Sequence, residues 1–257
     1  MIESARKAAA VYAQSLPDYI VKRTTARYRS ATQTNSAADA RSALSTRIDP
    51  GAGTSGADPW QPIDTISGDV TVERGREVYT NVRVNGNPAK YLPPGGSWSA
   101  GEFSGQMLIV LAPEREAQFT HPHAESLRGR PSVRYDFTID QAHSAWNMAA
   151  ANTGYARSDV DYSPAYTGRI WIDKETGQAL SIEMSARGLP SGFPVATIDS
   201  RTDYDFVKIG DARFLLPVHS QTLSCEPGGR ACLKNETDFR DFRKFESNTN
   251  ITFDQPK

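Results

Sequence analysis

Three of the four histidines lie close together in the sequence and could hold a metal ion or move a proton. His121 and His123 stand two residues apart in THPH, and His143 follows in QAH. Side chains two apart share one face of a strand, and a third histidine nearby would complete a zinc-type site. Pro122 would disturb a regular strand, however, and no helical H-x-x-x-H pair or cysteine partner lies nearby. Isolated surface histidines are the simpler interpretation, and a metal site of His121, His123 and His143 is the alternative.

Pairs of carboxylates are the second feature that could do acid–base chemistry. A glycosidase-type site needs two such groups facing each other across a cleft. Asp173 and Glu175 lie in DKETG, whose Thr-Gly end is instead typical of a hairpin loop in which Gly177 takes a positive φ. We therefore predict that Asp173 and Glu175 are corner residues of a hairpin. Two further pairs fit the wet face of a strand: Asp159 with Asp161, and Asp203 with Asp205.

Motifs for nucleophilic or phosphate chemistry are absent from the sequence. GGSWSAG misses the G-x-S-x-G pattern, and neither Gly-rich phosphate loop occurs. An enzyme on this chain would be a hydrolase or lyase that uses His121, His123 or His143 with an acid such as Asp140 or Asp159. We expect binding rather than catalysis, and no cofactor.

The two cysteines indicate the compartment. Cys225 and Cys232 flank EPGGRA, a turn that would bring two antiparallel strands within disulfide reach, and two free thiols are the alternative. Zinc takes four ligands, so this pair alone does not suit a zinc site. A disulfide favours an oxidising compartment. We therefore expect a periplasmic or secreted protein whose signal peptide has been removed.

Length and charge restrict the function classes. The chain has 257 residues and a formal charge of −1, which fits one large β domain and gives no electrostatic case for binding nucleic acid. No apolar run reaches the ~18 residues of a membrane span. Arg6, Arg23, Arg27 and Arg29 occur near acids or at alternating positions, which is typical of a solvated face.

The predicted elements form a β meander with two helices. Residues 2–16 have an apolar stripe and are followed by a long strand within 18–30. The polar, Gly- and Pro-containing segment 31–61 is expected to be a flexible insertion within a single domain of residues 1–257. Period-two alternation then predicts a run of strands: 66–73, 78–84, 132–139, 146–157, 165–174, 178–187, 198–209, 212–224 and 232–246.

A second helix is predicted between two of these strands. Phe103, Met107 and Leu111 are four apart, and Pro113 would end the helix. A curved sheet closed by helices commonly leaves an apolar cavity between them. We expect Phe103, Met107, Leu108 and Leu111 to contact an apolar ligand there, with Trp98 at the entrance.

The last strand has an irregular aromatic spacing. Phe239, Phe242 and Phe245 are three apart, which fits neither face of a regular strand. We predict a β-bulge between Phe239 and Phe242.

Two hairpin patterns resemble those of a known superfamily. GRIWIDKETGQALSIEMSA contains W-I-D-x-x-T-G, and YDFVKIGDARFLLPVHSQ contains I-G-D-x-x-x-L-P. In this respect the chain is similar to the lipoprotein-carrier (LolA/LolB-like) half-barrels. More narrowly, SLPDYIVKRTT, GEFSGQM and NETDFRDFRKF resemble a group of uncharacterised exported proteins of soil bacteria. The resemblance covers about 18–30 and 62–254, but neither the insertion nor SCEPGGRAC belongs to it.

The resemblance implies a fold and a ligand class. The expected fold is mainly β (α+β), a strongly curved antiparallel sheet or half-barrel of about ten or eleven strands with an N-terminal helix and one lid helix. The expected function is an exported module that holds a lipid or other apolar ligand, in lipoprotein or envelope-lipid handling. The alternatives are the histidine enzyme above and an interaction protein that binds an envelope protein.

Overall fold

The computed structural model describes residues 1–15, 19–30, 60–73, 76–90, 101–103, 105–150, 160–227 and 231–244. The predicted insertion, apart from Trp60 and Gln61, lies outside these residues, as does Trp98. The helices are α1 (Ile2–Ser15) and α3 (Gly105–Leu111), with short 3-10 turns at Pro113–Arg115 and Gln141–His143. The strands, in chain order, are β1 (Tyr19–Ser30), β2 (Trp60–Glu73), β3 (Arg76–Val84), β4 (Asn87–Pro88), β5 (Gln118–Leu127), β6 (Arg130–Ile139), β7 (Met148–Ala150), β8 (Val160–Tyr162), β9 (Tyr166–Asp173), β10 (Ala179–Arg187), β11 (Thr197–Ile209), β12 (Ala212–Cys225) and β13 (Cys232–Lys244).

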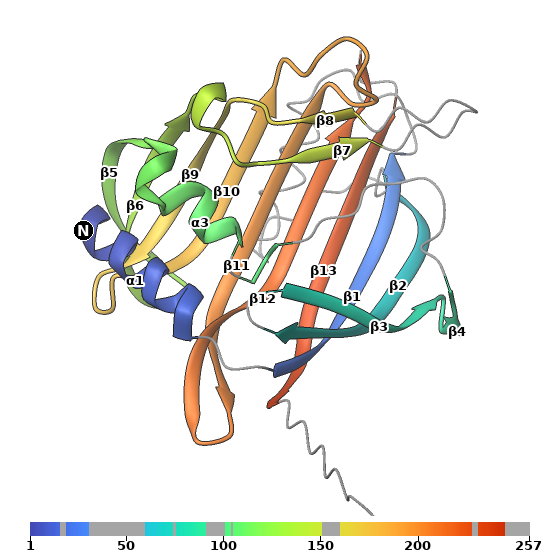
Figure 1. Ribbon diagram of the computed structural model, residues 1–257, viewed down its shortest axis with the longest axis horizontal. Helices are drawn as coiled ribbons and strands as arrows, with labels where there is room; N and C mark the ends of the chain where they lie inside the picture. Colours follow the sequence, from blue (N-terminus) through green and yellow to red (C-terminus); the bar gives the residue numbers. More distant parts are fainter. Residues whose placement is uncertain are drawn as a thin grey trace, which may run out of the picture.

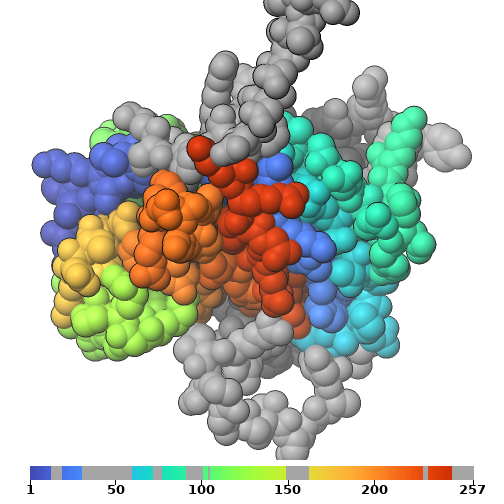
Figure 2. All heavy atoms as spheres, turned by 90° about the horizontal axis from the view of Figure 1, so that it is seen from below, coloured from blue at the N-terminus to red at the C-terminus, as the bar shows by residue number. Residues whose placement is uncertain are grey.

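A single antiparallel sheet forms most of the structure. Among the described residues it has eleven strands in the order β4-β3-β2-β1-β13-β12-β11-β10-β9-β6-β5, so this part of the sheet is open, with edges at β4 and β5 (Figure 1). The first and last strands of this sheet pair with each other, β1 with β13. Figure 2 shows the same order as neighbouring bands, from orange β12 through red β13 and blue β1 to cyan β2. The predicted fold class, a curved antiparallel sheet of about eleven strands with two helices, is confirmed.

β-Bulges interrupt the register of several strands. The predicted bulge between Phe239 and Phe242 is confirmed: the register shifts there, and Asp241 takes a φ of 57°. Two other shifts contain a non-glycine residue with positive φ, Asn81 in β3 and His121 in β5. An extra residue on one strand bends it and increases the local twist, so these bulges contribute to the curvature of the sheet.

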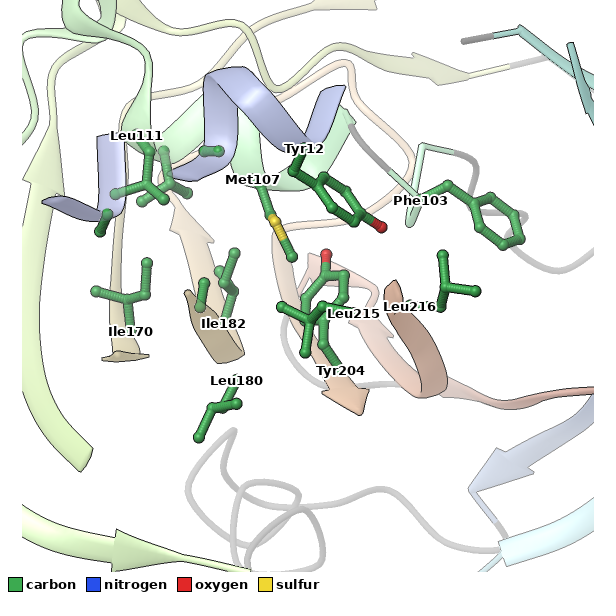
Figure 3. Packing of buried hydrophobic residues seen from close by; sticks show 14 of the residues in the cluster. Tyr12, Phe103, Met107, Leu111, Ile170, Leu180, Ile182, Tyr204, Leu215 and Leu216 are labelled. Atoms are coloured by element: carbon green, nitrogen blue, oxygen red, sulfur yellow. The ribbon is translucent and has the colours of Figure 1, made fainter. Parts of the chain in front are cut away.

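Both helices pack on one face of the sheet, which we call the inner face. They lie in front of β9, β10 and β11 (Figure 1). The predicted stripe of α1 is buried at Ala5, Ala9 and Tyr12. Tyr12 and Met107 point from the helices towards the strands, where Tyr204 and Leu215 meet them (Figure 3). The apolar residues of the helices and those of the strands therefore pack together in one hydrophobic core.

The segment predicted as one strand over 146–157 is different. Only Met148–Ala150 forms a strand there, and it pairs with Val160–Tyr162 in a separate two-stranded sheet, while residues 151–159 lie outside the described ranges. Met148 packs with Ala186 and Phe193, so this small sheet covers part of the inner face. Within the described part of the chain, no helix is long and apolar enough to cross a membrane.

Candidate functional site

Asp173 is a structural residue of the β9–β10 hairpin. Its side chain is 1% exposed. Its Oδ1 accepts hydrogen bonds from the backbone N–H groups of Glu175 at 2.7 Å and Thr176 at 3.1 Å, and its Oδ2 accepts one from Arg130. Burial alone would raise the pKa of Asp173, but these hydrogen bonds and the positive charge of Arg130 outweigh it and lower the pKa. Gly177 has a φ of 72°, so the prediction of a hairpin corner is confirmed.

The three histidines lie on two elements, and two of them contact a nearby carboxylate. His121 sits in the β5 bulge with its side chain 78% exposed, 3.3 Å from Asp136. His123, next to the same bulge, pairs in register with Arg134 of β6. His143 lies in a 3-10 turn, 2.8 Å from Asp140. Its hydrogen bonds lower the pKa of that carboxyl.

No metal centre is formed by these histidines. Among the residues that the structure describes, no group of three or more His, Cys, Asp or Glu side chains is arranged to hold a metal ion. The bulge at His121 breaks the strand alternation on which the alternative site of His121, His123 and His143 depended.

The two other acid pairs give no catalytic dyad in the described residues. Asp203 accepts a hydrogen bond from Ser181 at 2.7 Å and pairs with Arg201 and Arg128, whereas Asp205 is exposed. Asp159 and the side chain of Asp161 lie outside the described part.

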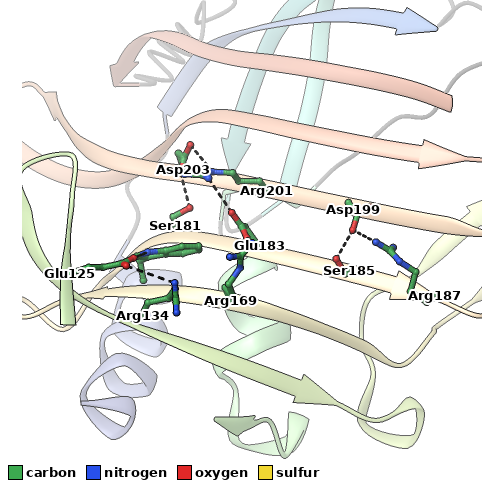
Figure 4. Close-up of polar contacts among 11 residues, drawn as sticks. Glu125, Arg134, Arg169, Ser181, Glu183, Ser185, Arg187, Asp199, Arg201 and Asp203 are labelled. Atoms are coloured by element: carbon green, nitrogen blue, oxygen red, sulfur yellow. Dashed lines mark hydrogen bonds and ion pairs between the residues drawn. The ribbon is translucent and has the colours of Figure 1, made fainter. Parts of the chain in front are cut away.

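The outer face of the sheet carries a ladder of ion pairs, in which Glu183, Arg201 and Asp203 follow one another (Figure 4). The Trp171 indole lies among these pairs and outside the main hydrophobic core. The guanidinium groups of Arg169 and Arg201 lie 5.8 and 5.7 Å from its ring, and its N–H donates to Glu125. Glu183 pairs with Arg169 at 2.7 Å and with Arg201 at 3.1 Å. Charges of opposite sign are thus matched along the ladder.

The predicted ligand-binding stripe of the second helix belongs to the core. Phe103, Met107 and Leu111 are buried in the main hydrophobic cluster, with Phe103 against Tyr19 and Phe239. Leu108 is half-buried. None of these four residues lines the pocket described next. Helix α3 contacts both α1 and β10.

A pocket of about 270 Å³ lies beside the neighbouring stripe of α3. Its walls come from the start of α3, the segment before β7, and strands β10 and β11. One part is apolar, with Ile109, Trp146 and Met184. The other part is polar, with Glu102, Gln106, Asn147 and Ser200, and Gly101, Gly105 and Ala145 complete the lining.

A buried ion pair stands at the polar end of this pocket. Arg23 of β1 is 2% exposed, and its Nη2 lies 3.3 Å from Glu102 Oε1. Its Nη1 also donates to the Tyr79 hydroxyl at 2.8 Å. That hydroxyl in turn donates to Glu77 at 2.6 Å, and Glu77 accepts the N–H of Gly101 at 2.9 Å. This network fixes the chain at the entry of α3 to strands β1 and β3.

Burial and the neighbouring Glu102 raise the pKa of Glu77, although the hydrogen bond from Tyr79 opposes them. Tyr204 donates to the backbone carbonyl of Glu102 at 3.0 Å, and burial raises its pKa well above the ordinary value. The phenol therefore stays a hydrogen-bond donor at neutral pH. A site of this kind can bind and orient a ligand through hydrogen bonds.

The expectation that the early arginines lie on a solvated face is wrong for two of them. Arg23 and Arg27 are both buried, and Arg27 makes two hydrogen bonds to Asp64 at 2.6 and 2.7 Å. They alternate with Val21 and Thr25 on the inner face, and each is neutralised by a carboxylate. In the sequence, the alternation of these arginines with Val21 and Thr25 was the signal that they share the buried face of the strand.

Comparisons with known proteins add one structural likeness. No protein-family model and no curated protein sequence matches the chain. Among solved structures, the chain is similar to the crystal structure of a LolA superfamily protein from Nitrosomonas europaea, at 10% identity and a TM-score of 0.33, over 98% of this chain and 96% of that chain. The strand order by itself defines the fold: an open antiparallel sheet, with both described α-helices on its inner face (Figure 1).

Proposed function

We propose that residues 1–257 form one exported, LolA-like domain that binds a small lipid or other molecule with an apolar part. The pocket between α3 and strands β10 and β11 is the observation that carries this proposal. Ile109, Trp146 and Met184 give it an apolar wall, and its volume of about 270 Å³ is near the lower end of ordinary ligand sites. Each CH₂ group buried there would contribute about 0.8 kcal/mol.

The Cys225–Cys232 disulfide supports the exported location. We propose the periplasm or the cell exterior as the compartment. Handling of envelope lipids or lipoproteins, with an envelope protein as partner, is the setting that we propose for the binding.

A pocket-filling variant tests the binding site. A Cβ added at Gly105 meets no atom within 4 Å, and Gly105 lines the pocket, so Gly105→Phe would place a ring in the space without a backbone clash. We expect the affinity for the fluorescent apolar probe N-phenyl-1-naphthylamine to fall about tenfold or more, which corresponds to roughly 1.4 kcal/mol. Fluorescence titration measures this affinity, and native mass spectrometry of the freshly purified protein shows whether an acyl-bearing molecule is already bound.

Gly192→Phe is the matched control, because Gly192 is exposed, has no atom within 4 Å of an added Cβ, and lies outside the pocket. It should bind the probe as the unmodified protein does. Equal affinity of Gly105→Phe and Gly192→Phe would place the probe elsewhere and contradict the proposed site.

A further inference from the structure

Two cross-strand rows of the inner face change from apolar to polar side chains at the pocket. Strands β9 and β10 present Ile170, Ile182 and Met184 to it. Across the next strand pair, Met184 faces Ser200 and Ile182 faces Thr202. The two cross-strand rows then continue with polar side chains as far as β1: Thr222, Asn235 and Arg27 in the first row, and Ser220, Thr237 and Thr25 in the second.

A buried hydroxyl group without a hydrogen-bond partner among the described residues lies on β11 beside the polar end of the pocket, although its residue does not itself line the pocket. Thr202 is 0% exposed, and its Oγ1 makes no hydrogen bond within the described part of the chain. Its neighbours on the same face of β11 are Ser200 and Tyr204, because alternate residues of a strand share a face. The Gln106 amide contacts both neighbours, with Nε2 3.3 Å from Ser200 Oγ and Oε1 3.4 Å from the Tyr204 hydroxyl. Gln106 therefore contacts the two residues that flank Thr202 on this face of β11, through two long hydrogen bonds.

Charge at this end of the pocket is balanced. Glu102 is the one ionisable side chain among the described residues that line it, and Arg23 holds that carboxylate at 3.3 Å. An anionic group would approach Glu102, and a cationic group would have to compete with Arg23 for the same carboxylate. An uncharged group that both donates and accepts hydrogen bonds meets neither penalty, since hydroxyl and amide partners surround it.

We propose that the polar end of the pocket holds the uncharged, hydroxyl-bearing head group of a single-chain amphiphile, with the chain against Ile109, Trp146 and Met184. This inference rests on the proposed function, because it names the ligand class of the same pocket. The head group displaces the Gln106 amide from its two long hydrogen bonds. It then donates to or accepts from Ser200, Thr202 and Gln106, so the buried hydroxyl of Thr202 gains the partner that it lacks.

Three ligands with the same octyl chain test the head-group preference. They are n-octyl glucoside, which is uncharged and rich in hydroxyls, octanoate, which is anionic, and octyltrimethylammonium, which is cationic. Each is titrated below its micelle-forming concentration by isothermal calorimetry. We expect n-octyl glucoside to bind about fivefold or more tightly than either ion. Equal binding of all three, or tighter binding of an ion, overturns the inference.

Thr202→Val separates the role of the hydroxyl from that of the shape. Removing a buried hydroxyl without a partner should raise the melting temperature of the free protein, because its desolvation is no longer uncompensated. The same variant should bind n-octyl glucoside about threefold to tenfold more weakly and octanoate unchanged. Ser200→Ala, at a half-buried position, should also lose part of the glucoside preference. Thr138→Val, at an exposed position of β6, is the matched control and should change neither.

The outcomes separate the two proposals. If none of the three ligands binds and N-phenyl-1-naphthylamine does not bind either, the proposed function itself fails. If the ligands bind, lose affinity in Gly105→Phe and show no preference for the glucoside, only the head-group inference fails. A melting temperature lowered by Thr202→Val would show that the hydroxyl already has a stabilising partner, and it would likewise contradict the inference.

Discussion

At the scale of single residues, the acid pair Asp173 and Glu175 lies at the turn of the β9–β10 hairpin, where Asp173 has a structural role. Asp173 uses both carboxylate oxygens to hold the turn, and Arg130 reaches it from the neighbouring strand. Gly177 is required by its positive φ and by the closeness of α1, since an added Cβ would lie 2.6 Å from Ser4 Oγ. The first turn of α1 is therefore seated on the tip of this hairpin.

Gly177→Ala tests both requirements. A positive φ costs a non-glycine residue about 1–2 kcal/mol, and crowding against Ser4 adds about 1 kcal/mol. We expect the free energy of unfolding, measured in urea, to fall by the sum of these effects. Gly129→Ala is the matched control, because Gly129 has a φ of 80° but no atom within 4 Å of an added Cβ. Ser4→Gly should restore only the crowding part, and equal losses in both alanine variants would contradict the contact with α1.

Asp173→Asn tests the lowered pKa. A carboxyl whose pKa is lower in the folded state stabilises the protein above its ordinary pKa of 3.8, and this stability is lost as the pH falls through the folded-state value. We expect Asp173→Asn to be less stable at neutral pH and to lose less further stability on acidification. Urea unfolding over an acidic pH series measures both. Glu175→Gln, at an exposed neighbour, should follow the unmodified protein, and parallel acid limbs for Asp173→Asn would contradict the assignment.

At the scale of elements, the β12–β13 hairpin is closed by the disulfide at a position of directly paired residues. Cys225 pairs with Cys232 in register, and Trp60 and Leu223 pack around them in a separate cluster on the outer face. Lys234 lies over the Trp60 ring at 4.9 Å from the centroid. The disulfide thus joins a local aromatic cluster that ties β2 to the hairpin.

Removal of the disulfide should destabilise the protein moderately. The two cysteines are seven apart, and closing so short a loop stabilises by about 2–3 kcal/mol in the chain-entropy view. We expect Cys225→Ala/Cys232→Ala to lower the melting temperature by about 5–10 °C, because each kcal/mol shifts it by about 2–4 °C in a chain of this size. Reductant should lower the melting temperature of the unmodified protein to the same value and leave the variant unchanged. A melting temperature that neither change moves would contradict a stabilising bond.

Element positions could largely be predicted from the sequence, because strand alternation and helical spacing are local signals. The Phe239 and Phe242 spacing even located a bulge, since a regular strand cannot bury both rings on one face. The pocket could not be found in this way. The apolar stripe of α3 predicts which side of the helix is buried. Whether a given side of the helix packs against protein or borders a cavity depends on tertiary packing, which the local sequence does not show. The ion pair of Arg23 could not be predicted either, because its partner Glu102 is far away in the sequence.

At the scale of the whole molecule, two halves of the sheet present different kinds of side chain on the part of the inner face beside the pocket. In the two cross-strand rows beside the pocket, β9 and β10 contribute apolar side chains, whereas β11, β12, β13 and β1 contribute hydroxyl, amide and charged groups. The pocket lies where these halves meet, at Met184 and Ser200. An amphiphilic ligand suits this boundary better than a purely apolar one, because burying polar groups without hydrogen-bond partners is unfavourable.

The pairing of β1 with β13 has a consequence for how the chain is made. During synthesis, β1 to β4 and β5 to β12 emerge as two separate meanders, each held by contacts between neighbouring strands. Residues that pair in the final sheet, such as Arg29 and Leu233, are about two hundred positions apart, so the closing contact is among the last to form. Until β13 arrives, β1 and β12 each present an unpaired edge to other nascent chains. The thirteen residues of β13 turn two incomplete sheets into one and remove both edges together.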